Sequence, residues 1–138
     1  MSASQRSIAL VEAFLADIGA GRHSVAQASL ADDAELVFPG GRRYRSLAEL
    51  AAGSRSRYRR VDKHRDVYEA TEDGSLVWSI GRLHGENLHG VVFDGVRYVD
   101  RFRLRDGLIV EQWVWNDLAE SGVLDARTHD ELAQEWRA

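Results

Sequence analysis

Hydrophobic residues follow a helical spacing in the first half of this chain and an alternating spacing from His64 onward. Apolar residues three and four positions apart indicate helices, and alternation indicates strands with one buried face. The first half predicts a helix over 8–18 that ends at glycines, and then a short helix over 24–30. A strand over 34–38 follows and ends at the turn Pro39-Gly40-Gly41. A third helix begins at a Ser46–Glu49 capping box and runs towards Tyr58.

The second half predicts a meander of strands followed by a short helix. Its strands span 64–71, 75–84, 91–104 and 108–116, and a capping box at Thr128 and Glu131 begins the C-terminal helix. Helices first and strands afterwards indicate an α+β fold in a single domain over 1–138. We expect a curved antiparallel sheet that wraps around the N-terminal helices as a cone with an internal pocket.

Composition narrows the class of protein. The 138 residues include no cysteine, which excludes disulfides and cysteine metal sites, and by default we expect a cytoplasmic location. No apolar run approaches the roughly 20 residues that span a membrane, so no membrane partner is expected. Polar and acidic positions interrupt the apolar pattern of the first residues, and no secretory signal is expected there.

The net charge of −4 is unevenly distributed. The segment 42–65 holds nine Lys and Arg residues against two acidic ones, which is one signature of nucleic-acid binding. The other interpretation is a solvated helix face with adjoining turns. We favour it because the rest of the chain is acidic and no nucleic-acid motif accompanies the cluster, so no nucleic-acid partner is expected.

Asp100 is the principal candidate for chemistry. On the predicted strand over 91–104 it shares a face with Tyr98 and Phe102, while arginines occupy the other face. A carboxylate on a core face costs several kcal/mol unless it is hydrogen-bonded or protonated. Burial also raises its pKa, which suits an acid or base near neutral pH. The alternative is a structural aspartate bonded to Tyr98, Arg82 or backbone amides.

His84 and Arg82 are the candidate partners of Asp100. They share a strand face with Trp78 and Ile80, and if that face points inward the pocket holds an imidazole and a guanidinium on apolar walls. The histidine would then serve as acid or base and the arginine as a clamp for a carbonyl or an anion. In the alternative, His84 is bonded to the following glycine loop and Arg82 only neutralises Asp100.

Aromatic and polar residues near the predicted pocket are candidates for ligand binding. They are Trp78, Tyr98, Trp113, Trp115, Tyr58 and Asn116. Each could instead be core packing, and on the last strand Val110 and Val114 compete with the tryptophans for the inner face. His84, Glu86 and His89 lack the spacing of metal ligands, so we expect no metal and no cofactor.

The segments LADDAELVFPGG at 30–41 and VDRFRLRDGLIVEQWVWND at 99–117, with the element order above, resemble the SnoaL-like polyketide cyclase family. That family belongs to the nuclear-transport-factor-two-like superfamily of α+β cones, and the resemblance covers about residues 5 to 120. The superfamily includes isomerases, cyclases, hydrolases, dehydratases and binding proteins. The resemblance therefore implies the fold more strongly than the activity.

Comparison with family sites narrows the mechanism. The tyrosine and the general base of ketosteroid isomerases correspond to Phe14 and Phe38, and only the hairpin aspartate remains, as Asp100. Limonene epoxide hydrolases resemble the chain at Arg82, but His84 and Val114 stand at the positions of their two carboxylates. The hairpin aspartate and preceding histidine of SnoaL-type cyclases are matched best, by Asp100 and His84.

Three hypotheses remain open at the level of sequence. The first is a cofactor-independent enzyme that cyclises, isomerises or dehydrates an apolar or cyclic carbonyl compound by acid–base catalysis. The second is a non-catalytic protein that binds a small apolar or aromatic molecule. The third is a dimeric interaction module. All three are compatible with a homodimer, because an open meander has a face that needs cover.

Overall fold

The computed structural model describes residues 1–137 and confirms the α+β class, with N-terminal helices and a curved, unclosed six-stranded sheet. The helices are α1 (Ala3–Gly19), α2 (His23–Gln27), α3 (Leu47–Ser54) and α4 (His129–Arg137), with a 3-10 turn, η1, at Pro39–Gly41. The strands are β1 (Leu30–Phe38), β2 (Arg42–Tyr44), β3 (Tyr58–Ala70), β4 (Leu76–Asn87), β5 (Val92–Arg105) and β6 (Leu108–Asn116).

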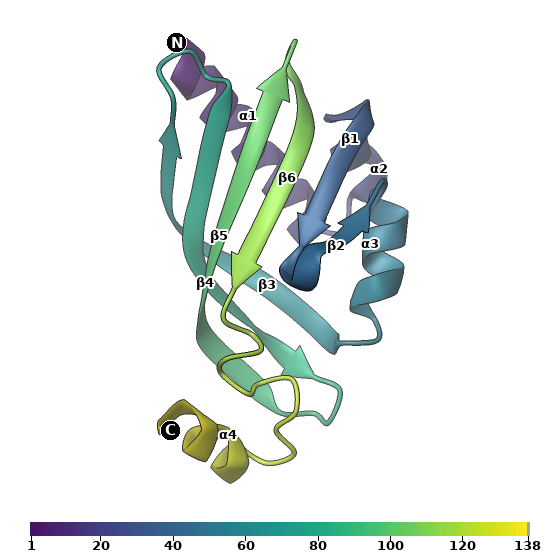
Figure 1. The fold of residues 1–138 in the computed structure, drawn as a ribbon, viewed down its shortest axis with the longest axis vertical. Coiled ribbons are helices and arrows are strands. Elements are labelled where there is room, and N and C mark those ends of the chain that lie inside the picture. The colour runs from purple at the N-terminus through teal and green to yellow at the C-terminus, as the bar shows by residue number, and fades with distance from the viewer. Residues whose placement is uncertain (138) are drawn as a thin grey trace.

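The strands lie in the order β2-β1-β6-β5-β4-β3. β3 to β6 form the expected antiparallel meander, whereas β1 joins its edge in parallel with β6. Figure 1 shows α1 lying behind the sheet, with the lower ends of β3 and β4 curving away from β6 and α4 lying beyond the lower end. The helices and the curvature together define an inner face, which packs against α1, and an outer face.

Three strands extend several residues beyond their expected bounds. β1 begins at Leu30, where the end of a helix is expected, rather than at Ala34. β3 begins at Tyr58 rather than at His64, and β4 continues to Asn87, where a loop is expected from the glycines. The extensions of β3 and β4 pair with each other, since Tyr58 is opposite Asn87 in the ladder. Backbone pairing therefore extends the sheet through a segment whose charged residues carry no strand pattern. The short β2 is also absent from the sequence prediction.

All three capped helix starts have a local cause in the sequence. Ser2 and Gln5 form a reciprocal capping box at α1. At α3 the Ser46 hydroxyl accepts the Glu49 amide at 3.2 Å, and before α4 the Thr128 hydroxyl accepts the Glu131 amide at 3.0 Å. These bonds satisfy amides that a helix start leaves without an intrahelical partner.

Buried residues on the inner face form two apolar clusters. One includes α1 and the upper ends of β4 to β6, and there Phe14 packs edge-on against Phe102 with ring centroids 6.0 Å apart. The other includes Phe93, Val96 and Tyr98 together with Val123 from the C-terminal segment. The side chains that face inward on β4 are Val77, Ser79 and Leu83, with Gly81 and Gly85 between and after them.

Gly81 and Gly85 allow β3 to pass close to the inner side of β4. A Cβ at Gly81 would overlap the carbonyl oxygen of His64, and one at Gly85 would overlap the carbonyl oxygen of Arg60. Because both obstacles are backbone atoms, neither can move aside as a flexible side chain would. Glycine at these positions is therefore what permits the sheet to bend.

Asn87 attaches the C-terminal segment to the sheet. Its side-chain amide, which is fully buried, donates to the carbonyls of Val123 and Ala126 at 2.9 and 2.6 Å. Its side-chain oxygen accepts the amides of His89 and Val91 at 2.8 and 2.9 Å. All of its hydrogen-bonding capacity is thereby used within the protein.

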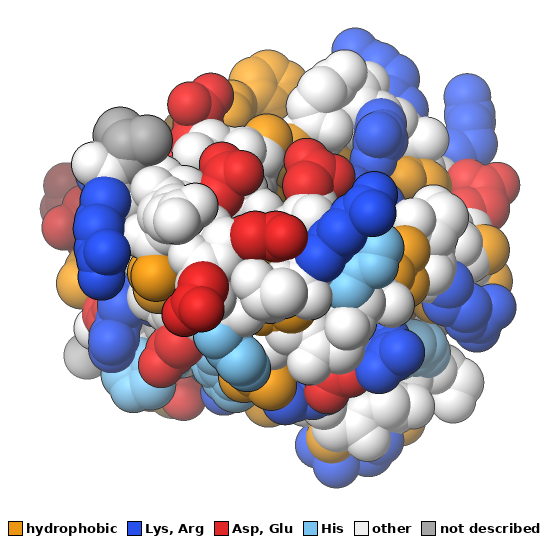
Figure 2. Space-filling view, turned by 90° about the horizontal axis from the view of Figure 1, so that it is seen from below, with side chains coloured by type: hydrophobic (Ala, Val, Ile, Leu, Met, Phe, Trp, Pro, Cys, Tyr) orange, Lys and Arg blue, Asp and Glu red, His pale blue; other side chains and the backbone are white. Residues whose placement is uncertain are grey.

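The end of the molecule that carries α4 presents a mixed surface. Figure 2 shows acidic and basic side chains interspersed on this end, with histidines between them. Within the basic segment 42–65, Arg59 pairs with Glu86 and Arg60 with Asp62. Among residues 1–137, no helix combines the length and apolar character that crossing a membrane requires.

Replacing Gly81 with alanine should destabilise the fold, because its Cβ would collide with backbone rather than with a movable side chain. We expect Gly81→Ala to lower the free energy of unfolding by about 1–3 kcal/mol, as overpacking does, measured by urea denaturation. Gly19→Ala is the matched control, since nothing lies within 4 Å of its Cβ. An equal loss in both variants would contradict this account of the bend.

Candidate functional site

Asp100 lies in the middle of β5 on the inner face, and its side chain is 0% exposed. In the sheet it stands between Ser79 of β4 and Val114 of β6. The strand alternation that identifies it in the sequence also places Tyr98 and Phe102 on the same buried face. A carboxyl group at this position is removed from water and must find its partners within the protein.

The cation that Asp100 requires comes from Lys63. The Lys63 ammonium forms an ion pair with Oδ2 of Asp100 and lies 4.8 Å from the ring centroid of Tyr98. β3 supplies this lysine because its close approach to β4 brings the side chain across the inner face. The Lys63 side chain is 21% exposed, so it is less completely buried than the carboxylate with which it pairs.

Hydroxyl groups lie next to this pair. The Tyr98 and Ser79 hydroxyls share a hydrogen bond of 3.0 Å, and Tyr68 of β3 stands opposite Ser79 in the ladder. Burial raises the pKa of Tyr98 to about 12 and also raises the pKa of Tyr68. Both phenols therefore keep their protons at neutral pH and can act as hydrogen-bond donors.

Several buried polar atoms in this region have no hydrogen-bond partner among residues 1–137. They are Asp100 Oδ1, Tyr68 Oη and Gln112 Oε1. Buried polar atoms in proteins are nearly always hydrogen-bonded, so a group of unpartnered ones needs an explanation and makes this region a candidate functional site. We refer to Lys63, Tyr68, Ser79, Tyr98, Asp100 and Gln112 as the interior polar cluster.

The pKa of Asp100 is raised above its usual range. Burial is the largest cause, and it outweighs the opposing effect of the Lys63 ammonium and the smaller effect of the Gln112 amide. A carboxylate whose pKa is raised by burial is a stronger base than an exposed one, and an adjacent ammonium can stabilise negative charge on an oxygen. The cluster therefore has the groups needed for proton transfer.

The structure corrects the expected grouping of Asp100 with His84 and Arg82. Burial alternates along β4 so that Ser79, Gly81 and Leu83 face inward, which places His84 and Arg82 on the outer face. Of these inner positions, Gly81 is one where a Cβ would collide with the backbone of β3.

Arg82 is instead part of an exposed network. Its guanidinium donates to Asp66 at 3.0 and 3.1 Å and contacts the ring of His64 at 3.0 Å. Arg82 accordingly lowers the pKa of Asp66 and does not reach Asp100. The expectation that it neutralises Asp100 is wrong, because Lys63 does so.

The tryptophans also lie on the outer face. Trp78 and Trp113 are half-buried on either side of Arg101, whose guanidinium carbon lies 3.9 Å from the Trp113 ring centroid. Trp115 packs edge-on against Trp113 at 6.1 Å and is 53% exposed. On β6, Val110 and Val114 face inward, and Val114 is buried beside Asp100.

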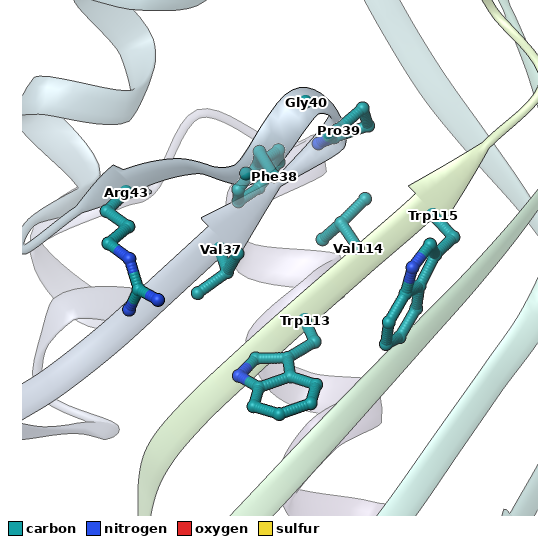
Figure 3. A pocket seen from close by; sticks show the side chains of 9 residues that line it. Val37, Phe38, Pro39, Gly40, Arg43, Trp113, Val114 and Trp115 are labelled. Carbon is teal, nitrogen blue, oxygen red and sulfur yellow. The ribbon is translucent and has the colours of Figure 1, made fainter.

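Trp113 and Trp115 line a shallow hollow of about 240 Å³ at the end of β1 and β6. Figure 3 shows Trp113 next to Val37 and Trp115 further along β6, with the Pro39–Gly40 turn and Arg43 also lining the hollow. Arg43 forms an ion pair with Glu35. Asp100 does not line this hollow, so the aromatic wall and the carboxylate belong to different surfaces.

The other residues expected to bind a ligand, Tyr98, Tyr58 and Asn116, lie at different places in the fold. Tyr98 faces inward and belongs to the interior polar cluster. Tyr58 begins β3 rather than ending a helix, and its hydroxyl donates to Ser54 at 3.1 Å. The Asn116 side chain accepts the Leu118 amide at 3.1 Å, while Asp117 pairs with Arg97 at 2.6 Å.

Sequence reasoning missed Lys63, Tyr68, Ser79 and Gln112. One signal was available for the first of them, since Lys63 is the only lysine among the 18 Lys and Arg residues. No local pattern identifies the others, because each is an ordinary polar residue until the strands are placed side by side.

Removing the Lys63 ammonium should make stability depend on pH. Burial raises the pKa of Asp100 in the folded chain, so its neutral form stabilises the fold below the unfolded pKa of about 3.9, and this contribution is lost as pH rises through the folded pKa. Lys63 opposes that shift, so Lys63→Met should raise the folded pKa further.

We expect Lys63→Met to lower the free energy of unfolding by about 3–5 kcal/mol at pH 8, as when one member of a buried pair is lost, and by clearly less at pH 5. Urea denaturation at both pH values measures the difference. The double variant Lys63→Met/Asp100→Asn should recover most of the loss at pH 8. A loss in Lys63→Met that is equal at the two pH values would show that Asp100 is not the group involved.

The fold of this chain is shared with known structures. A protein from Xanthomonas campestris pv. campestris, provisionally named a polyketide cyclase, is 23% identical with a TM-score of 0.73, over 86% of this chain and 96% of that one. TerC, crystallised with polyporic acid, is 17% identical with a TM-score of 0.78, over 88% and 99%. A nuclear-transport-factor-two-like protein of unknown function from Burkholderia pseudomallei is 16% identical with a TM-score of 0.75, over 88% and 98%.

At these identities the structures establish the fold alone. No curated protein matches the chain by sequence. The SnoaL-like domain family matches residues 11–112, a span that contains Lys63, Asp100 and every other member of the interior polar cluster. The chain therefore belongs to the SnoaL-like family.

Proposed function

We propose that this protein binds a small apolar or cyclic carbonyl compound at the interior polar cluster and moves a proton next to its carbonyl group. The proposal rests on the environment of Asp100. Its carboxyl group is fully buried, one oxygen is paired with Lys63, and the other has no hydrogen-bond partner among the described residues. The SnoaL-like family and the names of its structural neighbours support a carbonyl substrate.

Asp100 is the proposed acid–base group. Its free oxygen would take a proton from the carbon next to the carbonyl, and the Lys63 ammonium would stabilise the enolate oxygen as negative charge develops. The buried Tyr68 hydroxyl, which has no hydrogen-bond partner within residues 1–137, can donate a hydrogen bond to the same oxygen. The product could then be an isomer, a cyclised compound or a dehydrated one, depending on the ligand.

A second candidate is binding without chemistry. It is favoured by the ion pair itself, because Lys63 already occupies one oxygen of Asp100, and by Phe14, a fully buried phenylalanine where ketosteroid isomerases have a catalytic tyrosine. Polyporic acid, the compound crystallised with TerC, is a suitable first ligand for testing binding.

A cytoplasmic location stays a prediction from the sequence.

Deuterium exchange at a ketone distinguishes the two candidates. In D₂O, the wild-type protein should accelerate exchange of the α hydrogens of β-tetralone above the buffer rate, followed by proton NMR. Asp100→Asn should lose about 100-fold or more of this acceleration, because it removes the proton acceptor. Arg82→Gln is the control, and it should exchange like wild type because Arg82 lies on the outer face.

A folded Asp100→Asn variant with wild-type exchange would contradict the proposed role of Asp100. Binding of the ketone by wild type without any exchange above buffer would favour the second candidate. Circular dichroism of each variant establishes that its fold is retained.

We also propose that the outer face forms a homodimer interface. Val67, Ile80, Val99 and Trp115 are neighbours in one row across β3 to β6. Val67 is 41% and Trp115 is 53% exposed, so the row leaves apolar surface uncovered in a single chain. Such a surface supports association with a second copy.

Light scattering after gel filtration tests the dimer. We expect wild type to have twice the mass of one chain, and Trp115→Glu to reduce it to one, because a carboxylate would be buried at the interface. Leu88→Glu is the control, since Leu88 is 43% exposed but lies outside the row. A wild-type mass of one chain would exclude the proposal.

A further inference from the structure

Lys63 is chemically unlike every other basic residue in the chain. It is the only lysine among 18 Lys and Arg residues, and it is the cation that reaches the buried carboxylate. Elsewhere arginine provides the positive charge, including in the ion pairs on the outer face. A guanidinium stays protonated in proteins, whereas a lysine amine can lose its proton and act as a nucleophile.

The surroundings of Lys63 suit a reactive amine. The ammonium is hydrogen-bonded directly to Asp100, so the carboxylate is placed to take its proton. The nitrogen lies 4.8 Å from the centroid of the Tyr98 ring, and 21% of the Lys63 side chain is exposed, so the amine stands beside an aromatic ring on a side chain that is not fully buried. The free Oδ1 of Asp100 and the unpartnered Tyr68 hydroxyl lie in the same interior polar cluster.

We propose that the Lys63 amine condenses reversibly with an aldehyde or ketone to form a Schiff base. This inference rests on the proposed function, because it uses the same cluster and the same class of carbonyl compound. It assigns Lys63 a covalent role in place of a purely electrostatic one. The carbonyl compound that reacts with Lys63 would be mostly apolar rather than phosphorylated or strongly charged, because the inner face around the cluster is apolar.

The step balances without any further reactant. Asp100 takes a proton from the Lys63 ammonium, and the neutral amine attacks the carbonyl carbon to form the carbon–nitrogen bond. The carbonyl oxygen becomes a hydroxyl group through transfer of a proton from nitrogen. Asp100 then returns its proton to that hydroxyl, which leaves as water. The product is a protonated Schiff base beside the Asp100 carboxylate, with the original net charge.

A Schiff base would also explain why a carboxylate and a lysine stay together at this site. The protonated imine withdraws electrons from the adjacent carbon more strongly than the parent ketone, so its α hydrogen is more acidic. The Asp100 carboxylate, freed of the ammonium proton, is then the nearest base. The two residues would thus act in sequence, Lys63 on the carbonyl carbon and Asp100 on the neighbouring hydrogen.

Reductive trapping tests the proposal directly. The full chain is incubated with β-tetralone and sodium cyanoborohydride, which converts a Schiff base into a stable secondary amine. Because the chain has one lysine, only Lys63 and the N-terminal amine can carry the adduct. We expect intact-mass spectrometry to show the added mass, and peptide mapping to place it on Lys63 with loss of tryptic cleavage before His64.

Lys63→Arg is the matched variant, since it keeps a cation for Asp100 but removes the amine. We expect it to lose the adduct apart from any at the N-terminus, and Asp100→Asn to form the Lys63 adduct more slowly. An adduct confined to the N-terminus of wild type would overturn the proposal, and mapping on wild type decides this even if a variant fails to fold. Trapping without α-hydrogen exchange would support the Schiff base and contradict the proposed proton transfer. Exchange without trapping would support the proton transfer and contradict the Schiff base.

Discussion

The close approach of β3 to the inner side of β4 is the constraint on which the rest of this structure depends. It is possible only because Gly81 and Gly85 have no Cβ where the backbone of β3 passes. The approach bends the sheet, decides which residues of β4 face inward, and brings Lys63 across to the buried Asp100. Bulkier residues at the two glycines would remove the bend and, with it, the pairing at the centre of the cone.

The Lys63–Asp100 pair is poorly explained as a device for stability. Well-packed apolar residues of similar size are often as stabilising as a buried ion pair, because desolvation of the two charges offsets their attraction. The surroundings are apolar on both sides, with Phe102 in one buried cluster and Tyr98 in the other. Unpartnered polar atoms beside the pair add to the energetic cost. These features are the ones on which the proposed ligand site rests.

The two faces of the sheet have different chemistry. The inner face holds one carboxylate, one amine and hydroxyl groups at low exposure, while the outer face holds tryptophans and arginines in salt-bridged rows. Membership of the SnoaL-like family is compatible with many reactions, so the identity of the inner groups decides more than the fold does. Phe14 packs against Phe102 and adds no polar group to this face, whereas Lys63 adds an amine beside Asp100.

The sequence by itself determined the α+β class, the helix starts at Ser46 and Thr128, and the buried position of Asp100, because caps and strand alternation are local properties. It could not determine which face of β4 is inner. The alternation of β4 is compatible with either face pointing inward, and the close approach of β3 at the two glycines places Trp78 and Ile80 outside. Nor could it pair Lys63 with Asp100, since residues far apart in the chain meet only when strand register and sheet curvature are fixed.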